Sequence, residues 1–339
     1  MSFFPLAALP VALLVTWAAM PLVVRLAWAT GYLDHPEARK LHTSATALLG
    51  GVAVFAVALA VWGLAMRLMP HSPEDWEGYY LISGGTLALA LGMWDDRFGM
   101  APSIKMLGQA AAATLIVAAG AVPQFGLPHG VEAAITLVAL IGLMNAVNFL
   151  DNMNGMVGGL APIALAGFAW MSLERGAQGV AAAQLALAGA CVGFLPFNFP
   201  RARIFLGDAG SLFLGYSLGA SALIAMRSQP PGWAQVGPLL ALGYPAFDMV
   251  FVILTRLKDR SPVYQGGKDH TNHRLATLVR QPALTVVTVW LVAAALAASG
   301  FVLTRTPGTG VPPVLVAAWI AVALVAGLRL AGVPVVRRG

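Results

Sequence analysis

The 339-residue chain has little charge and almost no cysteine. Asp, Glu, Lys and Arg make up 10% of its residues, hydrophobic residues make up 59%, and the mean hydropathy is +0.78. Soluble domains carry about 25% charged residues, so this composition excludes an ordinary soluble domain and indicates a polytopic membrane protein. The single cysteine, Cys191, lies in an apolar segment and cannot form a disulfide framework.

The N-terminus also lacks the features of a secretory signal peptide. No basic residue precedes its apolar run, and no small-residue cleavage site follows a short apolar core. The first apolar run is therefore predicted to be a membrane-spanning helix. The chain offers no thiol cluster and no H-E-x-x-H helix, which argues against a zinc site.

Long apolar runs make up most of the sequence. A spanning helix needs about 20 mostly apolar residues, and this criterion predicts an all-α integral membrane fold with about 10–11 transmembrane helices. No repeat or low-complexity linker divides the chain, so residues 1–339 are predicted to form a single domain. The predicted spans lie near residues 4–24, 47–67, 79–93, 104–121, 131–148, 156–173, 179–197, 209–226, 236–255, 284–303 and 312–331.

Basic residues are distributed unequally between the two sides of these spans. Of the 20 Lys and Arg residues, only Arg67, Arg175, Arg227 and Arg305 fall near the side opposite the first loop. The positive-inside rule then makes the basic side cytoplasmic. In the plasma membrane, the N-terminus is predicted to face the outside and the C-terminus the cytoplasm. The net charge of +6 follows from this bias, so no nucleic-acid partner is expected.

Acidic and amide residues gather on the predicted cytoplasmic side. The segment GMWDDRFGM contains Asp95 and Asp96, NAVNFLDNMNGM contains Asn148 and Asp151, and RIFLGDAGSLFLG contains Asp208 just before a predicted helix. Carboxylates at a low-dielectric boundary ionise readily only beside a cation, and Mg²⁺ prefers hard oxygen ligands. Interhelical hydrogen bonding and helix capping are the alternative explanations for these residues. The acidic segment SPEDWEG, on the opposite side, is predicted to be a solvated turn.

Cations complete the polar set on the same side. Lys40 lies in ARKLH, Lys105 in SIKMLGQ, and His270, His273 and Arg274 in GGKDHTNHRL. Histidines flanked by Lys and Arg in a glycine-containing loop indicate phosphate binding rather than metal binding. Acids that suit Mg²⁺, cations that suit phosphate and a lipid-facing scaffold together imply a phosphorylated substrate that meets a lipid.

The ordered set of motifs resembles the polyprenyl-phosphate N-acetylhexosamine-1-phosphate transferases, a family that also includes the first membrane-bound enzyme of peptidoglycan synthesis. The likeness extends from Asp34 to Arg274. Its motifs are DHPEARKLHTSATALLGG, the Asp95–Asp96 pair followed by Lys105 and Gln109, NAVNFLDNMNG, FNFPRARIFLGDAGS, YPAFD and RSPVYQGGKDHTNHRL.

The chain departs from the family pattern at a few positions. Asn152 and Asn154 replace a glycine and an aspartate, and Ala47 replaces the proline before the Gly-Gly pair. Thr271 and Asn272 interrupt the consecutive histidines, and the H-H-H-F-E pattern of the peptidoglycan enzyme is missing. The missing H-H-H-F-E pattern favours the sugar-phosphate transferases over the peptidoglycan enzyme.

The resemblance implies transfer of a sugar 1-phosphate, expected to be N-acetylhexosamine 1-phosphate, from a UDP-sugar to polyprenyl phosphate at the cytoplasmic face. It implies Mg²⁺, with Mn²⁺ as a substitute, and a homodimer as a family expectation. The expected metal ligands are Asp208 and one of Asp95 and Asp96, while the other member of that pair takes a proton from the lipid phosphate. Asp151 is expected to position or help ligate.

The remaining expected roles concern substrate contacts. Lys40, Lys105, His270, His273 and Arg274 are expected to hold phosphates. Asn148, Asn154 and Asn198 are expected to contact the substrate through their amides, and Phe205 to stack on the nucleobase. A covalent aspartyl-phosphate route stays open.

Two other classes of membrane protein fit parts of the pattern. An aromatic prenyltransferase is also helical and Mg²⁺-dependent, but it would carry two N/D-x-x-x-D motifs and no GDAGS turn. A transporter would place its acids at mid-membrane on broken helices, whereas these acids are predicted at one face.

Overall fold

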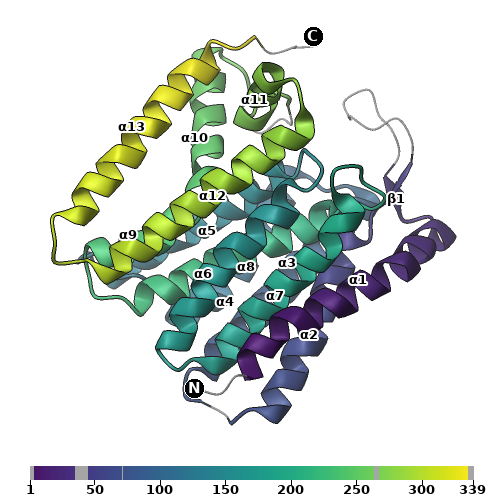
Figure 1. Cartoon of the computed structure of the whole chain (residues 1–339), viewed down its shortest axis with the longest axis horizontal. Coiled ribbons are helices and arrows are strands. Elements are labelled where there is room, and N and C mark those ends of the chain that lie inside the picture. The colour runs from purple at the N-terminus through teal and green to yellow at the C-terminus, as the bar shows by residue number, and fades with distance from the viewer. Residues whose placement is uncertain (1–3, 35–44, 71, 263–266, 335–339) are drawn as a thin grey trace.

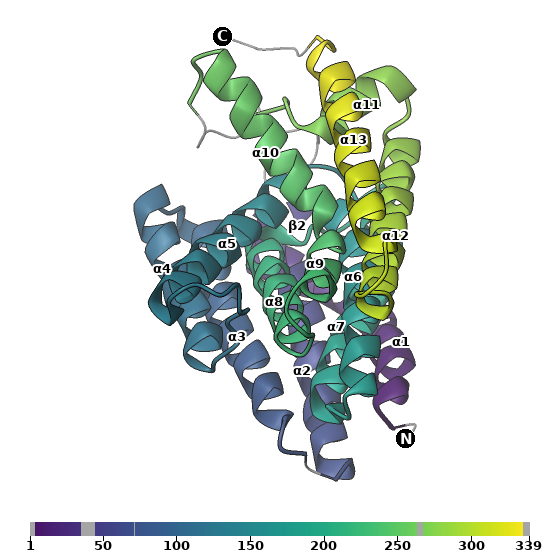
Figure 2. The same ribbon diagram turned by 90° about the vertical axis from the view of Figure 1, so that its left-hand side faces the viewer.

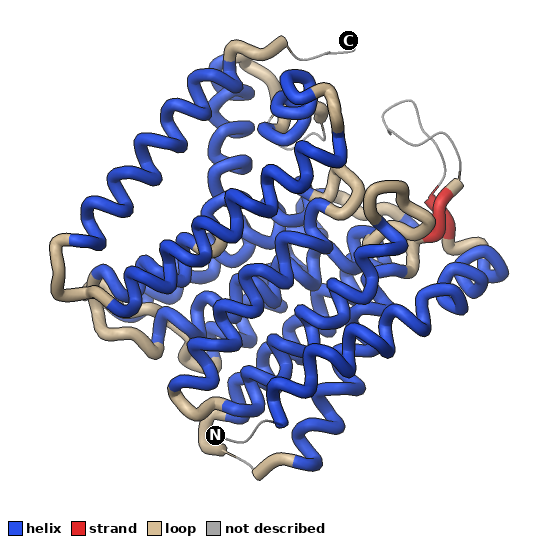
Figure 3. The backbone as a smooth tube through the Cα atoms, in the orientation of Figure 1, coloured by secondary structure: helices blue, strands red, loops and turns tan. Residues whose placement is uncertain are grey.

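The computed structural model describes residues 4–34, 45–70, 72–262 and 267–334, and within them nearly every element is a helix (Figures 1 and 3). A backbone in lipid must satisfy its polar groups internally, which favours helices for a chain this apolar. The helices are α1 Phe4–Thr30, α2 Gly50–Leu68, α3 Asp75–Phe98, α4 Pro102–Ala118, α5 His129–Leu150, α6 Met156–Glu174, α7 Gln178–Asn198, α8 Gly207–Arg227, α9 Trp233–Leu240, α10 Gly243–Lys258, α11 Thr271–Val279, α12 Pro282–Arg305 and α13 Val311–Ala331.

Every predicted span coincides with a helix or, in one case, with a broken helix. Among the described residues, eight helices are long and apolar enough to cross a membrane, namely α1, α2, α5, α6, α7, α8, α12 and α13. The total becomes nine if the bent pair α9–α10 is one span. The helix α3 bears acids at both ends and α4 has only 17 residues, so neither meets the same criterion. The polytopic all-α fold is confirmed.

The ninth predicted span is not a straight helix. The axes of α9 and α10 meet at 77°, across a break at Ala241 and Leu242. Pro245 lies just after the start of α10 and lacks the backbone N–H of an ordinary residue, which weakens the ladder at this point. The bend directs α10 to the end of the molecule that also carries α11 (Figure 2).

The helix α8 forms the centre of the bundle. Its membrane-spanning segment is completely buried, because α3, α5, α2 and α6 surround it. Glycines allow its first turn to come unusually close to its neighbours. A Cβ at Gly92 of α3 would lie 2.3 Å from the Asp208 carbonyl oxygen, and one at Gly51 of α2 would lie 2.2 Å from Gly210 Cα.

The two ends of the bundle differ in their polar contacts. The chain termini lie at opposite ends (Figures 1 and 2). Near the end that carries the N-terminus, Glu77 is buried and pairs with Arg175 and Arg227, while Asp75 accepts hydrogen bonds from the Ser72 backbone N–H and hydroxyl. The solvated turn predicted for SPEDWEG is therefore wrong, because both of these acids are buried with partners.

At the other end, two short strands join the loops. Strand β1, Leu33–Asp34, pairs antiparallel with β2, Thr46–Ala47, and Ala47 forms a further bridge with Ile204. The backbone N–H groups of Gly50 and Gly51 donate to the carbonyls of Phe205 and Leu206. These contacts fix the chain that leads into α8.

Candidate active site

The first turn of α8 places Asp208 at the centre of the polar end. Gly207 has a φ of +75°, a conformation that glycine adopts without steric cost, and it turns the incoming chain into the helix. The Asp208 side chain is 36% exposed, whereas that of Asp95 is 13% exposed. Asp208 is thus the more accessible carboxylate of the two.

Lys105 joins two carboxylates and one amide from three other helices. Its Nζ lies 2.7 Å from Asp95 Oδ2 and 2.8 Å from Asp208 Oδ2, and it donates to Asn148 Oδ1 at 3.2 Å. Asn148 Nδ2 in turn donates to Asp208 Oδ1 at 2.7 Å and to the Ser211 hydroxyl at 2.8 Å. The predicted neighbours from α3, α4, α5 and α8 therefore form one connected network.

Asp96 has a different environment from Asp95. Its Oδ1 accepts the backbone N–H of Asp208 at 2.8 Å, and its Oδ2 accepts that of Ala209 at 3.0 Å. A carboxylate at a helix N-terminus satisfies free N–H groups and interacts favourably with the helix dipole. Both oxygens of Asp96 are occupied by α8, whereas Asp95 faces Lys105 beside Asp208.

Asp151 lies just beyond the last residue of α5. Its carboxylate makes no hydrogen bond with the described residues. Burial, and then the charges of Asp208 and Asp96, raise the pKa of Asp151 to about 7. A carboxyl group with a pKa near neutrality can exchange a proton under physiological conditions.

Amides tie the loop between α5 and α6 to the loop between α7 and α8. Asn154 Nδ2 donates to the Pro200 carbonyl at 3.1 Å. Asn198 is buried and fully engaged, since its Oδ1 accepts the Gly155 N–H at 2.6 Å and its Nδ2 donates to the Ile204 carbonyl at 2.9 Å. Asn198 was predicted to contact the substrate, but in the structure its amide holds two backbone segments together. Gln109 and Asn145 pair similarly between α4 and α5, at 2.8 and 3.1 Å.

Phe205 lies in the same loop region. Its side chain is half-buried, and its backbone joins Ala47 and Gly50. Its stacking on a nucleobase stays a prediction.

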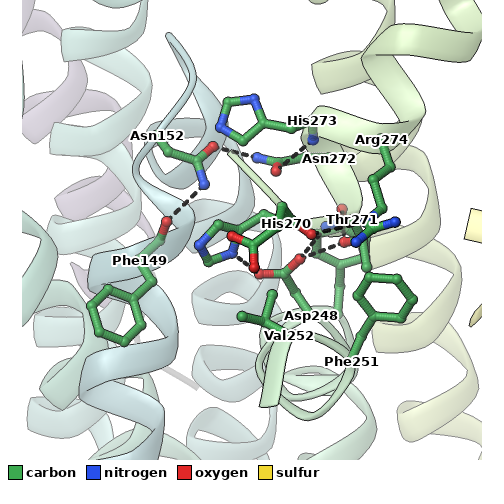
Figure 4. Close-up of polar contacts among 12 residues, drawn as sticks. Phe149, Asn152, Asp248, Phe251, Val252, His270, Thr271, Asn272, His273 and Arg274 are labelled. Carbon is green, nitrogen blue, oxygen red and sulfur yellow. Dashed lines mark hydrogen bonds and ion pairs between the residues drawn. The ribbon is translucent and has the colours of Figure 1, made fainter. Parts of the chain in front are cut away.

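The helices α10 and α11 bring a second group to this end (Figure 4). His270 Nδ1 lies 2.7 Å from Asp248 Oδ2, and both side chains are buried. Asp248 Oδ1 also accepts the Thr271 backbone N–H at 2.7 Å and its hydroxyl at 2.5 Å. Asp248 was not among the predicted site residues, although it belongs to the YPAFD motif. A lone carboxylate within an apolar run does not indicate its partner.

The loop after α5 contacts α11 through two asparagines. Asn272 Nδ2 donates to Asn152 Oδ1 at 2.6 Å, and Asn272 Oδ1 accepts the His273 backbone N–H at 2.8 Å (Figure 4). Burial, and then the charge of His270, lower the pKa of His273 to about 4. The His273 ring is therefore uncharged at neutral pH in this state.

Arg274 does not have the free guanidinium that the prediction required. It is buried, and its Nη1 donates to the carbonyls of Leu330 and Val333 at 3.1 and 2.9 Å, at the end of α13. A cation that satisfies the last carbonyls of a helix stabilises that terminus. We therefore assign Arg274 to the attachment of α13 rather than to phosphate binding. Lys40, also predicted to hold phosphate, lies outside the described residues.

The donor set is suitable for a hard divalent cation. Asp95 and Asp208 converge on one cationic atom, Lys105 Nζ, which shows that their charges meet at a point. No group of three or more His, Cys, Asp or Glu side chains in the described chain forms a metal-ligating cluster. Mg²⁺ usually takes one or two carboxylates and completes its shell with water and substrate phosphates, so two carboxylates fit.

Comparisons with known proteins agree on one family. The sequence profile described as "Glycosyl transferase family 4" matches residues 79–226. A probable undecaprenyl-phosphate N-acetylglucosaminyl 1-phosphate transferase of Bacillus subtilis (strain 168) is 30% identical over 302 residues, which cover 86% of this chain and 83% of that protein.

Two further relatives cover different shares of the chain. A decaprenyl-phosphate N-acetylglucosaminephosphotransferase of Mycolicibacterium smegmatis is 29% identical over 97% of this chain and 88% of its own. A phospho-N-acetylmuramoyl-pentapeptide-transferase of Levilactobacillus brevis is 34% identical, but over only 62% of this chain and 72% of its own.

Proposed function

Because the chain belongs to glycosyl transferase family 4, we propose that it transfers a sugar 1-phosphate from a UDP-sugar to polyprenyl phosphate, releasing UMP. The observation that carries this proposal is the convergence of Asp95, Asp208 and Lys105 at one polar end of an apolar helical bundle. Such an end brings a charged, water-soluble donor and a membrane-anchored acceptor to the same place.

The sugar is expected to be N-acetylglucosamine. The relatives that match most of this chain carry that sugar in their names, whereas the muramoyl-pentapeptide enzyme matches a smaller part. The family pattern at the last loop supports the same choice, because Thr271 and Asn272 stand between His270 and His273.

In the proposed reaction, an oxygen of the lipid phosphate attacks the phosphorus that bears the sugar. The bond from that phosphorus to the oxygen of the UMP phosphate breaks, and UMP leaves. We assign Asp208 and Asp95 to an Mg²⁺ ion, which would neutralise charge on the equatorial and leaving oxygens. Lys105 would supply a fixed positive charge beside the equatorial and leaving oxygens of the phosphate.

Asp151 is suited to accept the proton of the lipid phosphate. It lies at the same end as Asp208, its carboxylate makes no hydrogen bond with the described chain, and its pKa is raised to about 7. These properties support Asp151 in this role over Asp96, whose two oxygens bind the start of α8.

His270 and His273 are proposed to contact the phosphates of the donor. Asn148 orients Asp208, and Asn154 is proposed to contact the nucleotide through its carbonyl oxygen, which accepts no hydrogen bond from the described residues. The polar end is proposed to face the cytoplasm, from which a UDP-sugar arrives.

The alternative functions receive no support from the structure. A transporter would carry ionisable groups at mid-membrane on broken helices, but Asp95, Asp151 and Asp208 all lie at helix ends. The family match also separates the chain from the aromatic prenyltransferases.

The direct test is UMP release from UDP-N-acetylglucosamine by the purified protein, with and without polyprenyl phosphate and with and without Mg²⁺. We expect release only when lipid phosphate and Mg²⁺ are both present, together with a polyprenyl-diphospho-sugar in the lipid extract. UMP release that does not depend on the lipid would reject transfer to polyprenyl phosphate. Activity that survives complete removal of divalent ions would reject the metal assignment.

A further inference from the structure

The bend between α9 and α10 brings α10 to the end of the molecule that carries α11. The pair formed by Asp248 and His270 joins α10 to the start of α11. Asp248 lies in the second turn of α10, and His270 immediately precedes α11. Both side chains are almost fully buried, with Asp248 at 1% and His270 at 4% exposure. A buried carboxylate requires partners, so its hydrogen bonds determine how the surrounding groups are oriented.

The bonds of Asp248 determine which ring nitrogen of His270 carries a proton. An ionised carboxylate only accepts hydrogen bonds, so the Nδ1 that lies 2.7 Å away must donate. The other ring nitrogen, Nε2, has no partner among the described residues. Figure 4 shows the ring between Asp248 and the end of α5, with its second nitrogen turned away from Asp248. The Phe149 ring, near that end, lies 6.4 Å from the imidazole.

We propose that Asp248 is a positioning residue that fixes the Nδ1–H tautomer of His270 and directs Nε2 toward the phosphates of the donor. The catalytic consequence of this inference rests on the proposed function, whereas the hydrogen-bond geometry of Asp248 and His270 is independent of it. With Nδ1–H bonded to a carboxylate, the ring can bind a second proton at Nε2 and donate a charge-assisted hydrogen bond to a phosphate oxygen. The positive charge would lie between two anions.

Substitution of Asp248 by Asn makes a sharp test, because Thr271 fixes the orientation of the new amide. The position of Oδ1 receives two donors, the N–H and the hydroxyl of Thr271, so the amide oxygen must occupy it. The amide NH₂ then faces His270 Nδ1, and two donors cannot face each other. The ring proton is forced onto Nε2 and the doubly protonated ring is disfavoured, while the side-chain volume is unchanged.

We expect Asp248→Asn to lower kcat for UMP release by about 100-fold, with a much smaller change in the KM for polyprenyl phosphate, which is not proposed to contact His270. Thr271→Val is the matched control. It removes the hydroxyl that bonds Asp248 and Tyr244 but leaves the pair between Asp248 and His270 intact. We expect the control to lower the thermal midpoint while kcat stays within about threefold of the wild-type value.

A spectroscopic measurement tests the tautomer independently of catalysis. The chain has six histidines, so selective ¹⁵N-histidine labelling gives a short set of signals, and His270→Gln assigns the one of interest. The wild-type protein should show a protonated Nδ1 at His270, and Asp248→Asn should move that proton to Nε2.

Each outcome decides the proposal. An unprotonated Nδ1 in the wild-type protein overturns it, and so does full kcat in Asp248→Asn or an equal loss of kcat in Thr271→Val. If Asp248→Asn does not fold, the wild-type spectrum still decides the tautomer. Failure of the wild-type protein to release UMP would reject the proposed function instead, and would leave the spectrum as the test of the pair.

Discussion

At the residue scale, Asp208 combines accessibility with a fixed orientation. Asn148 and Lys105 hold its two oxygens, yet 36% of its side chain is exposed. We expect Asp208→Asn to lower kcat by about 10³-fold, because loss of a metal-ligand charge costs several kcal/mol at about 1.4 kcal/mol per tenfold change. UMP release at saturating Mg²⁺ measures the effect. The control is Asp259→Asn, the same change at an exposed position that ends α10. Near-normal activity of Asp208→Asn would reject its proposed role as a metal ligand.

His273 gives a prediction about protons. Its pKa of about 4 leaves the free ring uncharged above that pH, because burial and then His270 disfavour the cation. A phosphate beside the ring would reverse this balance and raise the pKa, so UDP binding at about pH 5.5 should be accompanied by proton uptake. Calorimetry in buffers of different ionisation enthalpy measures the uptake. We expect it to decrease in His273→Gln. Binding enthalpies that do not depend on the buffer would show that His273 does not contact phosphate.

Asn152 and Asn272 give a third prediction. Both positions depart from the family pattern, and their side chains bond each other at 2.6 Å. Residues in direct contact show coupling energies of about 0.5–3 kcal/mol, so the double variant Asn152→Ala with Asn272→Ala should be less destabilised than the sum of the single variants. Chemical denaturation of the four proteins in detergent provides the cycle. Strict additivity would show that the bond contributes nothing to stability.

Single residues were predictable from the sequence only where a motif specified their role. Asp95, Lys105, Asn148 and Asp208 lie together as predicted, because each belongs to a spaced motif, and their catalytic roles stay predictions. Asn198 and Arg274 belong to motifs as well, but they are buried and bond the backbone. A polar residue that holds a loop and one that binds a ligand look alike in sequence, since both need a partner away from water.

At the element scale, the close approach of α3 and α8 depends on glycine. A Cβ at position 92 would lie within 2.4 Å of backbone atoms of Asp208 and Ala209, and the backbone cannot rotate away. We expect Gly92→Ala to destabilise the fold by about 1–3 kcal/mol and to lower kcat, since the start of α8 carries Asp208. Gly63→Ala is the control, because nothing lies within 4 Å of a Cβ there. The control should be neutral or slightly stabilising in thermal unfolding. Equal midpoints for the two variants would contradict the packing account.

The positions of the helices followed from hydropathy because lipid imposes length and apolarity on a span. The break between α9 and α10 could not be predicted in this way, since a window average over 236–255 records how apolar the run is and not its direction. The burial of Asp75 and Glu77 was missed for a related reason. A short acidic run next to a span is usually solvated, and the arginines that pair with Glu77 are about 100 and 150 residues away in the chain.

At the scale of the whole molecule, the location of the polar clusters at one end was predictable from the alternation of spans. Hydrogen bonds now connect these clusters directly, for example between Lys105 and Asp208 and between Asn152 and Asn272. Which side of the membrane this end faces is still a prediction that rests on the distribution of Lys and Arg.

Cysteine labelling tests that orientation. The only native cysteine, Cys191, is fully buried, so it should give little background. We expect cysteines at Gly130 and Gly308 to react with an impermeant maleimide in intact cells, because both positions lie at the end away from the network and have open space around them. A cysteine at the exposed Lys268 should react only after the membrane is permeabilised. Labelling of position 268 in intact cells would reverse the assigned orientation.

The completely buried α8 has a consequence for where the product can go. A helix packed on every side by apolar neighbours fills the axis of the protein, and at its far end Arg227 is paired with Glu77. The protein thus offers a reaction surface and not a conduit. A sugar attached to lipid at the polar end stays in the leaflet where it was made, since its charged diphosphate cannot cross the hydrocarbon unaided. Any exposure of that sugar on the other leaflet would therefore require a separate protein that moves the lipid across the membrane.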